Sequence, residues 1–82
     1  MKAFDLKQIE YFKEIFPELT TEQLETALLF SLGLSKKEIA IMRSVSYIAV
    51  EKMLEVIKNK FEFYSLSNLL SLFQVRLFFS SC

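Results

Sequence analysis

The sequence predicts an all-α fold, a small bundle of four to five helices that contains a helix-turn-helix. Apolar residues recur at helical spacing along most of the chain, and a Ser, Thr or Asp stands where four of these patterns begin. One Gly and one Pro among 82 residues leave few places for turns. With 52% hydrophobic residues at this length, we expect one globular domain over residues 1–82.

The first predicted helix forms an N-terminal extension, residues 1–17. Phe4, Ile9 and Phe12 recur at helical spacing, and Asp5 is a suitable N-cap. Pro17 lacks a backbone N–H and fixes φ, so it favours an end to the helix near this position. The segment is expected to be amphipathic, with its apolar face on the core.

Two capping patterns then predict the next two helices. Thr20 is followed three residues later by Gln23, and the apolar pattern after them stops at Gly33, the residue type that most easily adopts a positive φ. Ser35 and Glu38 repeat the capping pattern and open a short helix that runs through Arg43.

A fourth helix is predicted after the tight connection Ser44-Val45, with Ser46 as its N-cap. Four apolar residues that begin at Val50 and follow the spacing i, i+4, i+7 and i+11 lie within about 60° of arc on a helix, so they form a buried stripe. This stripe comprises Val50, Leu54, Ile57 and Phe61. The helix-turn-helix core is expected over residues 19–64, and Val45 is expected to contribute to its interior together with Leu28, Ile39 and Ala40.

The apolar C-terminal segment, residues 65–82, fits two structures. Its leucines and phenylalanines between Ser67 and Phe79 fit a helix, whereas the alternation around Phe73 fits a strand. So small a chain cannot readily cover this many large apolar side chains, which begin at Phe63 and Tyr64. We therefore expect a homodimer through this segment, with Phe73 at the contact.

Composition excludes several function classes. The chain has no His, and its one Cys, Cys82, is expected to be inert, so the usual metal ligands and His-based acid–base pairs are lacking. One Gly cannot build a glycine-rich phosphate loop. No enzyme activity, metal or cofactor is predicted. No segment is long and apolar enough to span a membrane, and we expect a cytoplasmic protein.

The stretch from Leu19 to Phe61 resembles the DNA-binding domain of LuxR/FixJ-type (GerE-like) transcription regulators. The resemblance rests on the opening Leu19-Thr20, the run from Gly33 to Ala40, and the later pairs Val45-Ser46 and Ala49-Val50 at the family's spacing. It covers about half of the 82 residues. It implies a helix-turn-helix transcription regulator that binds DNA as a homodimer or with a partner regulator, the last helix being the common dimer contact.

The resemblance also implies which residues meet DNA. The helix from Tyr47 to Phe61 would enter the major groove, and Lys36 and Lys37 would lie near the phosphates. The expected DNA-binding residues are Lys36, Lys37, Tyr47, Ile48, Glu51, Lys52 and Glu55. The charge distribution fits, since residues 36–60 hold six Lys or Arg against three Glu, whereas residues 1–35 hold three Lys against six acidic residues.

Several residues depart from the family pattern. Glu51 and Glu55 stand where basic or neutral residues are usual, and two carboxylates are repelled by a duplex that carries one charge per about 1.7 Å. Ala49 replaces a Thr, Met53 a His, and Arg43 a buried Leu; we expect Arg43 to extend outward or pair with an acid of the first helix. The alternative is therefore a protein-interaction module that kept the helix-turn-helix scaffold and lost DNA binding.

Overall fold

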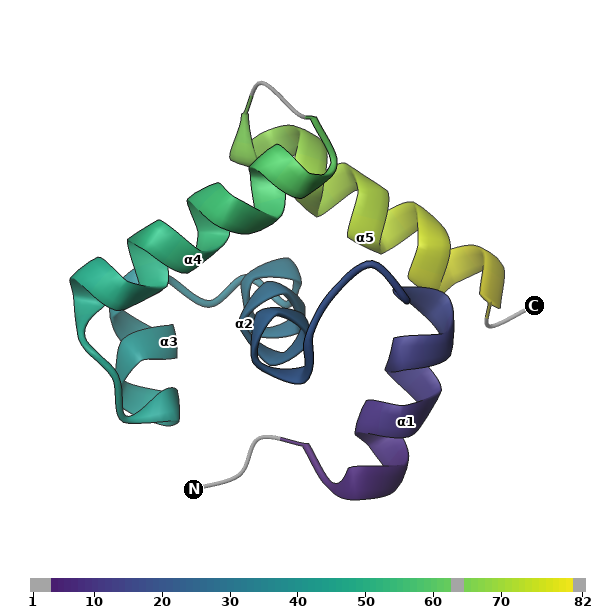
Figure 1. The fold of residues 1–82 in the computed structure, drawn as a ribbon, viewed down its shortest axis with the longest axis horizontal. Helices are drawn as coiled ribbons and strands as arrows, with labels where there is room; N and C mark the ends of the chain where they lie inside the picture. Colours follow the sequence, from purple (N-terminus) through teal and green to yellow (C-terminus); the bar gives the residue numbers. More distant parts are fainter. Residues whose placement is uncertain (1–3, 63–64, 81–82) are drawn as a thin grey trace.

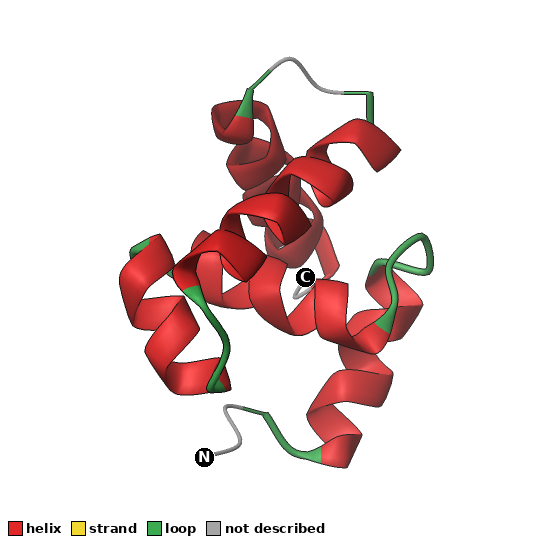
Figure 2. Ribbon diagram, turned by 60° about the vertical axis from the view of Figure 1, so that its left-hand side comes forward, coloured by secondary structure: helices red, strands yellow, loops and turns green. Residues whose placement is uncertain are grey.

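The computed structural model describes residues 4–62 and 65–80, and every secondary-structure element in these ranges is a helix (Figures 1 and 2). The helices are α1 (Leu6–Ile15), α2 (Thr21–Ser31), α3 (Lys36–Arg43), α4 (Tyr47–Lys60) and α5 (Leu66–Ser80). The predicted all-α bundle is confirmed, and residues 67–79 adopt the helical alternative. Phe63, Tyr64 and Cys82, which entered the expectations above, lie outside the described residues.

The central helix is α2, which packs against each of the other four helices. In Figure 1 it is viewed nearly end-on, with α3 and α4 on one side and α1 and α5 on the other. The residues Leu24, Thr26, Ala27, Leu28 and Leu29 are all buried, so α2 is covered around most of its circumference. A helix that is apolar on most sides needs this central place.

Side-chain caps fix the starts of the first four helices. Asp5, Thr20 and Ser35 each accept a hydrogen bond from the backbone N–H three residues later, and the side chain of that residue accepts one in return. Ser46 caps α4 by accepting from the N–H of Ala49 at 3.0 Å. Each of these starts was predicted, although the bond that the Asp5 backbone N–H donates to Oε1 of Gln8 was not.

The ends of α2 and α3 share one geometry. The N–H of Leu34 donates to the carbonyl of Leu29, and the N–H of Val45 donates to that of Ala40, so each bond spans five residues. The residues just before these donors are left-handed, Gly33 with φ 96° and Ser44 with φ 56°. The predicted role of Gly33 is confirmed, whereas at Ser44 the same turn is made by a residue with a Cβ.

The core follows the predicted helical stripes with two corrections. Val50, Leu54 and Ile57 are at most 1% exposed, and Ile39 and Ala40 are buried beneath them. Phe61 is only partly buried, because it caps the end of α4 rather than lying within it. Val45 was expected in the interior and is 41% exposed. It lies in the connection between two helices, where helical periodicity does not determine burial.

The C-terminal helix is joined to the α1–α2 connection by large side chains. Phe73 is fully buried, and its ring stacks on that of Phe16 with centroids 3.9 Å apart and planes inclined by 10°. The expectation that Phe73 lies on a contact surface is wrong. The exposed apolar residues of α5 are instead Val75, Phe78 and Phe79. A helix with two buried residues, Leu69 and Phe73, necessarily turns other side chains away from the core.

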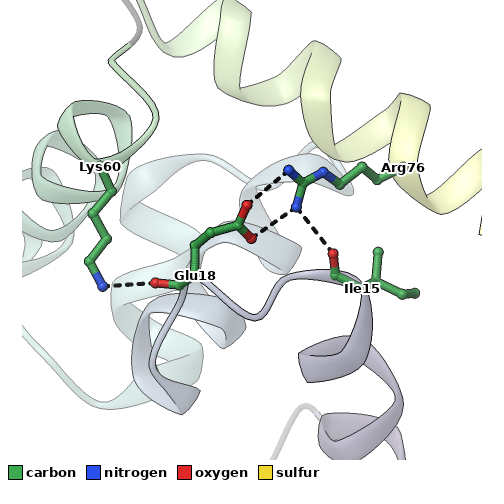
Figure 3. Close-up of polar contacts among 4 residues, drawn as sticks. All are labelled: Ile15, Glu18, Lys60 and Arg76. Carbon is green, nitrogen blue, oxygen red and sulfur yellow. Dashed lines mark hydrogen bonds and ion pairs between the residues drawn. The ribbon is translucent and has the colours of Figure 1, made fainter.

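A guanidinium clamp holds the same region together (Figure 3). Arg76 donates to both carboxylate oxygens of Glu18 at 2.9 Å and to the carbonyl of Ile15 at 3.1 Å. Its guanidinium carbon also lies 5.3 Å from the ring centroid of Phe16 and 5.6 Å from that of Phe61. One side chain of α5 therefore contacts the end of α1, the loop after it and the end of α4.

Candidate nucleic-acid interface

The predicted DNA-binding residues lie at the start of α3 and on α4 between Tyr47 and Glu55. Because Val50, Leu54 and Ile57 anchor one side of α4 in the core, the opposite side faces outward. Glu51, Lys52 and Glu55 are all exposed on that side. Tyr47 and Ile48, in the first turn of α4, are 48% and 60% exposed. The structure thus brings the predicted residues of α4 together on one accessible helix face.

Both acidic residues of this face are paired with lysines. The Nζ of Lys36, at the start of α3, lies 3.5 Å from Oε2 of Glu51. The Nζ of Lys58 lies 2.6 Å from Oε1 of Glu55, one turn along α4. Each carboxylate therefore has a cation beside it, which reduces the field it presents to an approaching polyanion. The first of these contacts engages Lys36, one of the two lysines that were expected near the phosphates.

The lysines of this half of the molecule differ in how far they are already engaged. Lys60 donates to the carbonyl of Glu18 at 2.9 Å and to the side-chain oxygen of Gln23 at 2.8 Å, so it ties α4 to the start of α2 (Figure 3 shows the first bond). Lys37 and Lys52 are exposed and make no ion pair with any residue in the described ranges. These two are the cations most available to an anionic partner.

Apolar side chains interrupt the charged face. Val56 is 50% exposed on α4, two turns after Ile48, so the two lie on the same side of the helix. Tyr47 adds an exposed ring at the helix start. Exposed apolar side chains among charges could contact the methyl groups of thymine in the major groove of DNA. They could equally contact the apolar surface of a protein partner.

Arg43 makes different contacts from those that the sequence suggested. Its Nη1 donates to the hydroxyl of Thr26, a residue with no exposed surface, and lies 3.6 Å from the sulfur of Met53. The Thr26 hydroxyl in turn contacts that sulfur at 3.1 Å. Arg43 thus pairs with no acid of α1 and instead joins a polar cluster between α2, α3 and α4. No sequence pattern predicted this cluster, because its members belong to three different helices.

Glu38, an acidic residue of α3, helps to cap the start of that helix. The pKa of Glu38 is held below its ordinary value because its carboxylate accepts a hydrogen bond from the backbone N–H of Ser35 and interacts with the Ser35 hydroxyl. The carboxylate therefore stays ionised near the N-terminus of α3, where the helix dipole favours negative charge. Glu38 therefore acts as a capping residue of α3.

Other kinds of site find little support. Within residues 4–62 and 65–80, no three His, Cys, Asp or Glu side chains are grouped so that they could hold a metal ion. The helices described there also include none long and apolar enough to cross a membrane. No family model, no curated protein and no solved structure matches this chain.

Proposed function

We propose that the protein is a small LuxR-like helix-turn-helix transcription regulator that binds DNA through the exposed face of α4. The observation that carries the proposal is the pairing of both acidic residues of that face, Glu51 with Lys36 and Glu55 with Lys58. Without these lysines, the two carboxylates would be repelled by the phosphates, which is the strongest argument against DNA binding. Paired, they leave Lys37 and Lys52 as the net positive groups beside the helix.

The pairing also implies weak binding with a small salt dependence. Each neutralised phosphate contributes about −0.9 to the slope of log K against log salt. Contacts from Lys36, Lys37 and Lys52 together give a slope of about −2.7 per protomer, whereas contacts from Lys37 and Lys52 alone give about −1.8. We expect the smaller value, since Lys36 is held by Glu51.

Fluorescence anisotropy with random duplex DNA across a salt series tests this proposal. Replacing Lys37 and Lys52 by Ala should remove the salt dependence, whereas replacing Lys36 alone should change the slope little. The matched control replaces Lys7 and Lys13, which lie on α1 at the other side of α2. A slope that depends on the α1 lysines and not on Lys37 and Lys52 would place the DNA surface elsewhere.

The proposed regulator acts as a homodimer through α5. Val75 is 52% exposed, Phe78 67% and Phe79 70%, so the last two turns of the helix present apolar surface. Light scattering at micromolar concentration should show a dimer that Phe79→Glu disrupts. Val56→Glu, which charges an apolar position on α4 that is 50% exposed, should leave the dimer intact. Disruption by Val56→Glu and not by Phe79→Glu would move the contact to α4.

A second candidate function is a protein-interaction module that has lost DNA binding. It is favoured by Tyr47, Ile48 and Val56, three exposed apolar side chains on the helix that would enter the groove. Under this alternative, low-salt DNA binding stays undetectable and a protein partner is lost on Ile48→Lys with Val56→Lys. Under the DNA-binding proposal, the same double variant gains affinity for duplex DNA, because it adds two cations to the face.

A further inference from the structure

A pocket of about 220 Å³ lies between α2, the end of α3 and the first two turns of α4. Its floor includes buried Val50 and the buried hydroxyl-bearing Thr26. Val45, which does not join the core, supplies part of its wall. Val45, which was expected in the interior, therefore lines this pocket instead.

Two opposite charges line this pocket without neutralising each other. Arg43 uses Nη1 for Thr26 and Met53, while its Nε and Nη2 make no hydrogen bond to any described residue. Glu22, on the α2 side, makes no ion pair or side-chain hydrogen bond in the described part of the chain. The two groups are more than 4.0 Å apart, since no ion pair joins them.

The chemistry of this lining selects a class of ligand. A simple anion is attracted by Arg43 and repelled by Glu22. A simple cation is attracted by Glu22 and repelled by Arg43. A zwitterion satisfies both, with its carboxylate on the free edge of the guanidinium and its ammonium on the carboxylate of Glu22. Val45 and Ala49 add exposed apolar surface to the lining, which suits a short apolar side chain. The volume is below the roughly 300 Å³ at which pockets for drug-sized ligands begin, so the ligand must be small.

We propose that this pocket binds a free α-amino acid with a short apolar side chain. The ligand contacts α2 through Glu22, the end of α3 through Arg43 and the first turn of α4 through Ala49, so it joins the central helix to the helix that carries the candidate DNA face. The inference does not depend on DNA binding, because every group that it uses lies in the pocket itself.

Two-dimensional ¹⁵N–¹H NMR titration with L-leucine, to millimolar concentration, tests the proposal. Chemical-shift changes should saturate and concentrate at residues of α2, the α3–α4 turn and the start of α4. Two probes that each lack one charge, 4-methylpentanoate and isopentylamine, should bind at least tenfold more weakly. Bound leucine should also raise the unfolding temperature of the protein, because the ligand binds only the folded chain.

Variants connect the binding to its residues. Glu22→Gln should weaken leucine at least tenfold and leave the fold intact, as Glu22 is exposed and engages no described partner. Arg43→Lys keeps a donor for Thr26 and loses the paired donors needed for a carboxylate, so it should weaken leucine similarly. Glu25→Gln, also on α2 but outside the pocket, is the control. Absence of leucine binding, equal binding of 4-methylpentanoate, or an unchanged affinity in Glu22→Gln would each overturn the proposal.

Discussion

On one side of α2, α1 and α5 meet through large side chains that are far apart in the sequence, whereas on the other side α3 and α4 are joined by a three-residue turn. Phe16 and Phe73 stack, and Arg76 reaches Glu18 across 58 positions. The α3–α4 side is held on α2 by aliphatic side chains at local helical spacing, such as Val50, Leu54 and Ile57. Caps at Ser35 and Ser46 and a partly exposed ion pair add to this packing. The first side holds the bundle closed, and the second leaves a helix face available.

The comparison predicts the largest stability effect at Phe73. Phe73→Ala removes a fully buried ring stacked on Phe16 and should cost about 3–5 kcal/mol, a large part of the roughly 5–15 kcal/mol that stabilises a small domain. Urea unfolding followed by circular dichroism measures it. Phe79→Ala, on the same helix and 70% exposed, is the control and should change stability by less than about 0.5 kcal/mol under monomeric conditions. Equal effects would mean that α5 does not close the core.

A smaller effect is expected where Arg76 meets Glu18. Glu18→Gln should cost about 1–2 kcal/mol at neutral pH, toward the low end because the two side chains are 41% and 31% exposed. The bidentate bond from Arg76 holds the pKa of Glu18 below its ordinary value of 4.5, and the pKa of Arg76 is raised by the same contact. A lowered folded-state pKa means stability that is present above 4.5 and is lost as the pH falls through the lowered value.

Unfolding measured from neutral pH to about pH 3 therefore gives a specific pattern. The difference between the wild type and Glu18→Gln should shrink with acidification, because the wild-type carboxylate becomes protonated. Glu14→Gln, on exposed α1 surface without an ion pair among the described residues, should show little difference at any pH. A Glu18→Gln deficit that stays constant down to pH 3 would show that the charge of Glu18 is not what holds α5.

The smallest effect should appear on the α3–α4 side, at the cap of α3. Ser35→Ala removes the acceptor for the N–H of Glu38 and should cost about 1 kcal/mol. An eight-residue helix is too short to persist alone, so its start depends on this cap and on packing against α2 and α4. Ser71→Ala, on the exposed side of α5 and without a cap to lose, should be neutral or slightly stabilising. A larger loss at Ser71 than at Ser35 would contradict the assignment of the cap.

The two sides also differ in how well the sequence predicts them. The helix starts at Thr20, Ser35 and Ser46 were predictable because a cap and its partner lie three residues apart. The stripe of Val50, Leu54 and Ile57 was predictable because helical spacing is local as well. The stacking of Phe73 on Phe16 was not, since nothing local indicates which of nine Phe residues finds a partner 57 positions away.

The candidate site shows the same division. Exposure of Glu51, Lys52 and Glu55 followed from the stripe on the opposite side of α4. The pairing of Lys36 with Glu51 did not, because it depends on how the start of α3 approaches α4. Arg43 was misplaced for a similar reason, since its partners Thr26 and Met53 come from two other helices.

The most direct test of the proposed function is the double variant Glu51→Lys/Glu55→Lys, measured by anisotropy with random duplex DNA at low salt. The variant changes the face by four charges and releases Lys36 and Lys58, so affinity should rise at least tenfold, or about 1.4 kcal/mol. Glu10→Lys/Glu14→Lys makes the same change on exposed α1, across α2, and should raise affinity much less. An equal rise in both variants, or no rise in a folded Glu51→Lys/Glu55→Lys protein, would contradict DNA binding by α4.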